Sequence, residues 1–357
     1  MARLSLIGLP NVGKTTLFNA LTGLDAPTAA HPFSTIEPNI GVARIPDERL
    51  EQAAEAEGSA KVVHATLDLL DLPAVSPGSA SFSAQFLGRL REMDALAAVV
   101  RAFEDEAVPD AESGTDPVAQ AEVLLLDLVL ADSEVFERRA AKAAKEATGD
   151  QSKRAPAAAI ARAAELLAAG TPLRSASWDD AELAAFRDLA PVTLKPCVWV
   201  INVGEDESDP DRLQAAVEAV VPDGDAVVVV SAALEAEAAR VDPADRDELY
   251  EGLGLGEGAL ARMVHATYEA LGLLSFFTVG PKEAHAWTVR SGAPAREAAG
   301  KIHSDLERGF IRAEVTSIET VIEAGGWDAA KAAGKVRLEG KEYPVAEGDV
   351  IVVRFSV

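Results

Sequence analysis

The stretch GLPNVGKTT fits the pattern G-x-x-x-x-G-K-[ST] from Gly8 to Thr15. In such a loop, successive backbone N–H groups point at phosphate oxygens, and the N-terminus of the following helix adds partial positive charge. Lys14 would bring its charge to the β- and γ-phosphates, and the Thr15 hydroxyl would reach Mg²⁺. RLSLI before the loop is typical of a strand, and TTLFNALTG after it is typical of a helix. We therefore predict a phosphate site made by Asn11, Val12, Gly13, Lys14, Thr15 and Thr16.

Two later positions gain meaning from their order after this loop. Thr35 lies in HPFSTIEPN, where switch-type NTPases place a threonine that closes over the metal and the γ-phosphate. Asp71 ends the next predicted strand, ATLDLLD, where a metal-side carboxylate is expected. Taken alone, each would be an ordinary loop threonine or turn aspartate. With the phosphate loop present, we predict that Thr15, Thr35 and Asp71 surround Mg²⁺.

The base-reading position falls in VWVINVGEDE. Guanine-specific proteins use N-K-x-D there, and the aspartate accepts two N–H groups from the base. Here Glu205 stands in the place of that aspartate, and its longer side chain should weaken guanine selectivity. The alternative is a solvated acid in an acidic loop. VVVVSAALEAE matches a loop that often packs beside the base. The predicted base-side residues are Asn202, Val203, Glu205, Ser231 and Ala232.

The elements that must position these residues alternate between short apolar runs and polar helical stretches. This rhythm predicts an α/β domain with a mainly parallel sheet, over residues 1–115 and 191–273. Residues 116–190 are rich in Ala, Leu and Glu and predict an inserted α-helical hairpin. Residues 274–357 predict a compact α+β module with its own core.

The net charge of −25 argues against a broad, non-specific grip on nucleic acid, so we expect no DNA partner. From Ser275 to Val357 there are 11 Lys and Arg against 12 Asp and Glu. This nearly neutral segment is the better candidate to meet RNA or an acidic surface, and the alternative is that the uneven charge is incidental. The single cysteine, Cys197, excludes an internal disulfide. No signal peptide or membrane span is evident, which predicts a cytoplasmic protein with no membrane partner.

The chain resembles the YchF/Obg-like ATPase family, within the Obg-related P-loop GTPases. The shared stretches include GLPNVGKTTLFNALT, PFSTIEPNIGV, LADSEVFERR, INVGE and AAGKIHSDLERGFIRAEV. The resemblance implies a G domain interrupted by a helical hairpin and followed by a β-grasp (TGS) domain. It implies ATP as ligand at least as well as GTP, and association with the ribosome through its RNA or protein. Asn11 matches an asparagine that assists a potassium ion in related GTPases, which makes K⁺ a candidate cofactor beside Mg²⁺.

The segment after Asp71 departs from the family pattern. The family has D-I-A-G-L, whereas this chain has Pro73 and then Ala74 in place of the glycine. Ala74 keeps an N–H for a phosphate oxygen but loses the conformational freedom of glycine. Val75 agrees with the hydrophobic residue of the family. RAFEDEAVPDAES lacks the histidine that the family tends to carry.

No obvious general base therefore follows from the sequence, and the catalytic residue is unassigned. We expect nucleotide binding with slow or partner-dependent hydrolysis. The alternatives are a nucleotide-sensing module that scarcely hydrolyses its ligand and a small-molecule kinase with the same P-loop. A kinase would need an arginine-rich lid, and the insertion is not of that composition.

Overall fold

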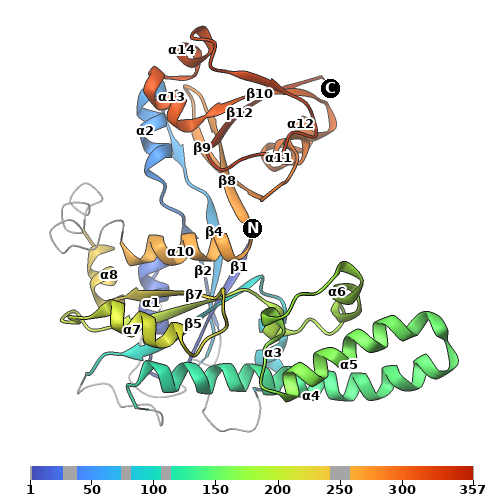
Figure 1. The fold of residues 1–357 in the computed structure, drawn as a ribbon. Coiled ribbons are helices and arrows are strands. Elements are labelled where there is room, and N and C mark those ends of the chain that lie inside the picture. Colours follow the sequence, from blue (N-terminus) through green and yellow to red (C-terminus); the bar gives the residue numbers. More distant parts are fainter. Residues whose placement is uncertain (1, 27–37, 74–81, 106–113, 242–257, 357) are drawn as a thin grey trace. The chain divides into compact units, whose positions relative to one another are not determined.

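The computed structural model describes residues 2–26, 38–73, 82–105, 114–241 and 258–356. These residues form two compact units. The larger unit contains Ala2–Val42 and Asp68–Ala270, and the smaller unit contains Ala43–Leu67 and Leu271–Val357. Figure 1 labels the helices and strands of both units.

The larger unit is built on one six-stranded sheet of order β2-β4-β1-β5-β6-β7. β4 pairs with β1, β1 with β5, β5 with β6 and β6 with β7, all in parallel. The central strands are apolar and almost fully buried, as expected for a parallel sheet covered on both faces. The strands are β1 (Arg3–Ile7), β2 (Asn39–Arg44), β4 (Thr66–Asp71), β5 (Ala95–Ala102), β6 (Cys197–Val203) and β7 (Ala226–Val230).

Helices cover both faces of this sheet. α1 packs against β1 and α8, and α10 packs against β5, β6 and β7. α4 and α7 contribute Leu124, Leu128 and Val217 to the core on the opposite face, around Trp199. In the described part of this unit, the helices outside the hairpin are α1 (Lys14–Thr22), α3 (Ala84–Arg91), α7 (Pro210–Glu218), α8 (Ala232–Ala238) and α10 (Ala259–Ala270), with the short 3-10 helix η3 (Val192–Leu194). The predicted α/β fold class is confirmed.

The predicted helical hairpin is present between β5 and β6. It consists of α4 (Pro117–Gly149), the 3-10 helix η1 (Gln151–Lys153) and α5 (Arg154–Ala168), followed by η2 (Leu173–Ser175) and α6 (Asp180–Phe186). Asp116 caps the start of α4, with Pro117 in its first turn. Phe136, Ile160 and Phe186 form a second core between the helices. Figure 1 shows the connection between α4 and α5 extending well beyond the sheet.

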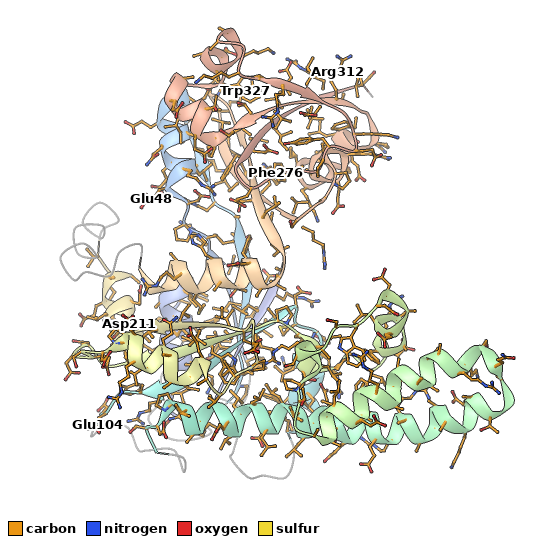
Figure 2. All side chains as sticks on the ribbon, in the orientation of Figure 1. Glu48, Glu104, Asp211, Phe276, Arg312 and Trp327 are labelled. Carbon is orange, nitrogen blue, oxygen red and sulfur yellow. The ribbon has the colours of Figure 1, made fainter. Side chains whose placement is uncertain are left out.

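The smaller unit has a six-stranded sheet of order β11-β10-β12-β8-β9-β3. One face packs on α11 through a core that includes Phe276, Val315 and Ile351 (Phe276 is labelled in Figure 2). Its strands are β3 (Val62–Val63), β8 (Leu273–Val279), β9 (Ala284–Arg290), β10 (Phe310–Ser317), β11 (Arg337–Glu339) and β12 (Asp349–Phe355). Its helices are α2 (Glu48–Glu57), α11 (Ala295–Ile302), α12 (Ser304–Arg308), α13 (Ile318–Ala324) and α14 (Trp327–Ala332).

Segment 43–67 belongs to this smaller unit, although its sequence position suggested the α/β domain. β3 pairs in parallel with β9 through Val62 and Ala284, and α2 packs on α13, β8 and β9. The Glu57 carboxylate accepts a hydrogen bond of 2.7 Å from the Trp327 N–H. The sequence-based assignment of this segment differs from the structure because the pattern of apolar residues predicts a strand or a helix but does not indicate which of two sheets that element joins.

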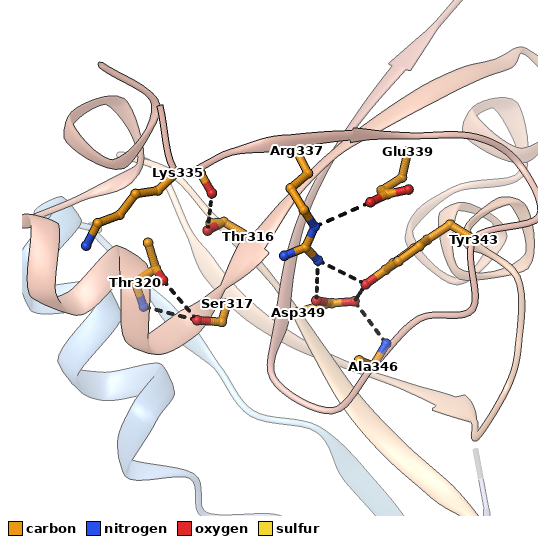
Figure 3. A network of polar contacts seen from close by, with 9 residues as sticks. All are labelled: Thr316, Ser317, Thr320, Lys335, Arg337, Glu339, Tyr343, Ala346 and Asp349. Carbon is orange, nitrogen blue, oxygen red and sulfur yellow. Dashed lines mark hydrogen bonds and ion pairs between the residues drawn. The ribbon is translucent and has the colours of Figure 1, made fainter. Parts of the chain in front are cut away.

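A polar network around the buried Asp349 closes the turn between β11 and β12 (Figure 3). Asp349 Oδ2 accepts hydrogen bonds from the Tyr343 hydroxyl and the Ala346 N–H, both at 2.9 Å. Arg337 donates to the Tyr343 oxygen at 3.2 Å. Burial raises the pKa of the Asp349 carboxyl, and these donors compensate in part. The network fixes the last strand in the smaller unit.

Candidate nucleotide-binding site

The loop between β1 and α1 has the strand–loop–helix geometry that the phosphate motif requires. Gly8 has a φ of +154°, and a Cβ there would lie 2.4 Å from the Val99 carbonyl oxygen. Gly13 has a φ of +90°, and a Cβ there would lie 2.2 Å from Asn202 Nδ2. Asn11 adopts a φ of 61°, a left-handed conformation that asparagine tolerates better than most residues. Only glycine fits both ends of this loop.

Lys14, the first residue of α1, is buried. Its ammonium donates hydrogen bonds to the Gly8 carbonyl at 3.1 Å and to the Leu9 carbonyl at 2.9 Å. Burial lowers the pKa of Lys14 to about 8, and the nearby Asp71 carboxylate opposes part of that fall. A buried cation that donates hydrogen bonds to carbonyl oxygens is poised to exchange them for the stronger attraction of phosphate oxygens.

The predicted metal-side pair is in direct contact. The Thr15 hydroxyl donates to Asp71 Oδ2 at 2.8 Å. Asp71 is 2% exposed at the end of β4, and Thr15 is in the first turn of α1. Magnesium prefers hard oxygen ligands, and a hydroxyl beside a buried carboxylate supplies that chemistry. The donor set therefore fits Mg²⁺. Thr35, the third predicted metal-side residue, lies outside the described residues, as do Ala74 and Val75.

Asn39 is a site residue that our sequence reasoning missed. It begins β2, and its Nδ2 donates to the same oxygen of Asp71, Oδ2, at 3.0 Å. Within the described part of the chain, no hydrogen bond involves Asp71 Oδ1. The sequence signal for Asn39 was weak, because it is a single asparagine at the start of a strand. Its contact with Asp71 follows only from the strand order, which places β2 beside β4.

Asn202 connects the phosphate loop to the predicted base-side elements. Its Nδ2 donates to the Val12 carbonyl at 2.9 Å, and its Oδ1 accepts from the Ala232 N–H at 3.0 Å. Ser231 accepts from the Leu234 N–H and begins α8. The sheet thus brings the ends of β1, β6 and β7 together, as expected for a ligand site at the carboxyl edge of parallel strands.

The remaining predicted residues differ in how closely they join this cluster. Val12 is fully buried and Val203 is nearly so, while Thr16 is half-buried in α1. Glu205 lies beyond the end of β6 and is exposed. It makes no hydrogen bond or ion pair to the described residues, so its side chain is available to a ligand or to solvent.

The fold and this arrangement of residues define a P-loop nucleotide-binding protein of the G-domain class with a helical insertion and a C-terminal α+β domain. Residues 3–128 match the family model of the 50S ribosome-binding GTPases. Residues 273–356 match the YchF-GTPase C-terminal family, described as a protein of unknown function (DUF933).

Relatives match over the whole chain. The ribosome-binding ATPase YchF of Escherichia coli O157:H7 is 41% identical over 358 residues, covering 99% of this chain and 98% of the relative. The Bacillus subtilis protein of the same name is 38% identical over 360 residues, with the same coverage. The solved structure of the Schizosaccharomyces pombe YchF GTPase has a TM-score of 0.84 and 27% identity, covering 99% of this chain and 97% of that one. The chain belongs to the YchF family, which confirms the resemblance seen in the sequence.

Proposed function

We propose that this chain is an Mg²⁺-dependent ATPase that associates with the ribosome. The observation that carries the proposal is the cluster of Lys14, Thr15 and Asp71 at the head of the P-loop, joined to the base side through Asn202. The full-length bacterial relatives bear the name ribosome-binding ATPase. The cluster accounts for nucleotide binding, and the ribosome is proposed from the relatives' name.

Each residue has a role set by its chemistry. Lys14 neutralises the β- and γ-phosphates, and backbone N–H groups from Asn11 to Thr16 bind phosphate oxygens. Thr15 and Asp71 hold the metal, which would supply Lewis-acid stabilisation of charge on the triphosphate. Asp71 keeps the Thr15 hydroxyl oriented by accepting a hydrogen bond from it. Thr35 is proposed as a further metal-side residue on its sequence position alone.

We propose adenine over guanine because Glu205 stands where guanine-specific proteins have aspartate. The exposed position of Glu205 leaves room for either base, and the S. pombe relative is called a GTPase. Calorimetric titration of the full chain with ATP and with GTP, each with and without Mg²⁺, tests the proposal. Tight GTP binding without ATP binding would refute the role given to Glu205, and no binding of either nucleotide would refute the function.

A second candidate, a nucleotide sensor that scarcely hydrolyses ATP, is favoured by the sequence after Asp71. Pro73 and Ala74 replace the flexible glycine turn, and no histidine follows in RAFEDEAVPDAES. Product formation in a single turnover, with and without ribosomes, separates the two. Replacing KCl by NaCl in the same assay tests K⁺ as a cofactor at Asn11, and equal rates would exclude it.

A further inference from the structure

The most basic segment of this acidic chain lies in the helical hairpin. Residues 138–162 contain seven Lys and Arg but only two Asp and Glu, whereas the whole chain has a net charge of −25. The C-terminal segment that seemed the better candidate for RNA is close to neutral by the same count. A local excess of positive charge on a strongly negative chain needs a physical explanation, because helix formation does not require it.

The scaffold that carries these charges is rigid at its base and exposed at its far end. Leu124 and Leu128 pack α4 into the core against the sheet, and Phe136 packs it into the hairpin core. Beyond Phe136, the only residue that α4 buries is Ala143. The distal half of α4 therefore packs on little besides α5, and the rest of its circumference faces solvent (Figure 1).

Three of the cations form a stripe along this distal half. Arg138, Lys142 and Lys145 follow one another at i, i+4 and i+7, and all three are exposed. Residues at this spacing lie on one face of a helix and are neighbours about 5–6 Å apart. Lys153 and Arg154 add two exposed cations where the chain turns into α5. The five charges share the same end of the hairpin.

The two acidic residues of the segment do not neutralise most of these charges. Glu146 lies 3.5 Å from Arg139 and 4.0 Å from Lys142. Asp150 accepts hydrogen bonds from the Ser152 N–H and hydroxyl, which hold it at the turn. Among the described residues, four cations of the segment make no ion pair. They are Arg138, Lys145, Lys153 and Arg154.

We propose that the distal half of the hairpin, residues 138–154, binds RNA through its phosphate backbone; this rests on the proposed ribosome association and names the surface for it. A chain of charge −25 is repelled by a polyanion unless a local cationic surface makes the contact. Between its cations the surface carries mainly alanine and no aromatic or large aliphatic side chain. Protein interfaces are usually anchored by such large side chains, whereas phosphate contacts need only cations and polar groups.

The test neutralises the four unpaired cations together, as Arg138→Gln, Lys145→Gln, Lys153→Gln and Arg154→Gln. Glutamine is a good helix former, and all four positions are exposed, so the fold should survive. The matched control removes the same charge from exposed positions of the smaller unit, as Lys282→Gln, Lys301→Gln, Arg312→Gln and Lys341→Gln. Circular dichroism and ATP affinity should be unchanged in both variants.

Binding is measured to purified ribosomes and to a fluorescent RNA duplex of about 20 base pairs, at several KCl concentrations. We expect the hairpin variant to lose at least about tenfold in affinity for both. The slope of log K against log[KCl] should become shallower by about 3, because each lost phosphate contact removes roughly 0.7–0.9. The control variant should stay within about twofold of the unmodified protein.

Three results would overturn the proposal. The first is a hairpin variant that keeps its affinity and salt slope. The second is a control variant that loses binding in its place. The third is competition by polyglutamate as strong as that by RNA, which would indicate an acidic protein partner. An unmodified protein that binds ATP but no ribosomes would instead contradict the ribosome part of the proposed function. Retained ribosome binding by the hairpin variant contradicts only the surface assigned here.

Discussion

At the scale of single residues, Asp71 is the group on which the metal side of the site depends. One of its oxygens, Oδ2, accepts from both Thr15 and Asn39. Two donors on one oxygen fix the rotation of the carboxylate and leave Oδ1 for a further partner such as a water on the metal. In the proposed site Asn39 is therefore a positioning residue, because it would act on Mg²⁺ through Asp71.

Replacing Asn39 with leucine removes one of these donors at nearly constant volume. We expect the gain in ATP affinity on adding Mg²⁺ to fall by about tenfold, the value of roughly one charge-assisted hydrogen bond. ATP affinity in EDTA should stay within about twofold. The measurement is calorimetry in both conditions.

Asn19→Leu is the control for this experiment. Asn19 is also half-buried, and its replacement removes two hydrogen bonds with Ala26. Neither of these hydrogen bonds involves Asp71. Its ratio of affinities with and without Mg²⁺ should match that of the unmodified protein. If Asn39→Leu lost ATP affinity equally with and without Mg²⁺, the role of Asn39 would be merely structural.

Lys14 gives the site a pH dependence. Its pKa in the free protein is lowered to about 8, and a bound triphosphate must raise it, because the anion favours the charged ammonium. Binding then takes up a proton above pH 8, so ATP affinity should be constant just below that pH and fall by up to tenfold per unit above it. Calorimetry at alkaline pH in two buffers of different ionisation enthalpy would detect the proton.

Lys14→Arg is the informative variant here, since a guanidinium stays charged throughout this range. It should bind ATP more weakly, because its planar head does not fit the two carbonyls of the loop. Its affinity should no longer depend on pH between about 8 and 9.5. A fall as steep as that of the unmodified protein would assign the titration to another group.

At the scale of elements, a buried ion pair joins the end of the helical insertion to the sheet. Arg174, in η2, donates to both oxygens of Asp225 at 2.7–3.0 Å, and the Trp199 indole N–H donates to the same carboxylate at 3.0 Å. The side chains of Arg174 and Asp225 are 8% and 6% exposed. The guanidinium therefore compensates the charge of a carboxylate that is almost fully removed from solvent.

Arg174→Met should destabilise the chain by about 3–5 kcal/mol, because it leaves the Asp225 charge buried without its partner. Arg162→Met is the matched control. Its pair with Glu182 is much more exposed, at 46% and 25%, and should be worth about 1 kcal/mol or less. Urea denaturation followed by tryptophan fluorescence measures both. Similar losses in the two variants would contradict the importance assigned to burial.

Some of the elements and contacts of this chain are encoded by local sequence pattern, and others are not. The P-loop, Lys14 and the hairpin were predictable because each is encoded by local pattern, namely turn glycines and helical period. The contact between Asn39 and Asp71 was not, because it depends on β2 lying beside β4 in the sheet. Non-local strand pairing leaves little trace in a single sequence.

At the scale of the whole molecule, the smaller unit is made of two distant pieces of chain. The pairing of Val62 with Ala284 and the packing of α2 had no local signal, because a two-residue strand carries no measurable period. The sequence-based boundaries at residues 115, 190 and 273 remain a proposal for the functional domains. Of the three, only the boundary at residue 273 lies near a division between the compact units, which falls between Ala270 and Leu271. Residues 116–190 are part of the larger unit, and residues 43–67 are part of the smaller one.

Leu50→Ala tests whether α2 supports the smaller unit. Leu50 is fully buried in α2, so the cavity should cost about 2–5 kcal/mol. Hydrogen exchange should accelerate in β8 and β9, while the amides of β1 and α1 keep their protection and ATP affinity is unchanged. Leu126→Ala is the control, at a leucine of α4 that is 52% exposed, and it should change neither the stability nor the hydrogen exchange of β8 and β9. Faster exchange in β1 would contradict the division into units.

The divided origin of the smaller unit also has a consequence for biosynthesis. Residues 43–67 leave the ribosome early, but their partners in β8 and β9 are synthesised only after the whole of the larger unit, from residue 273 onward. Chains fold from the N-terminus as they are made, so α2 and β3 must wait with an unpaired apolar surface until β8 and β9 have been synthesised. This interval is when the nascent chain would be most prone to aggregate and most dependent on a chaperone.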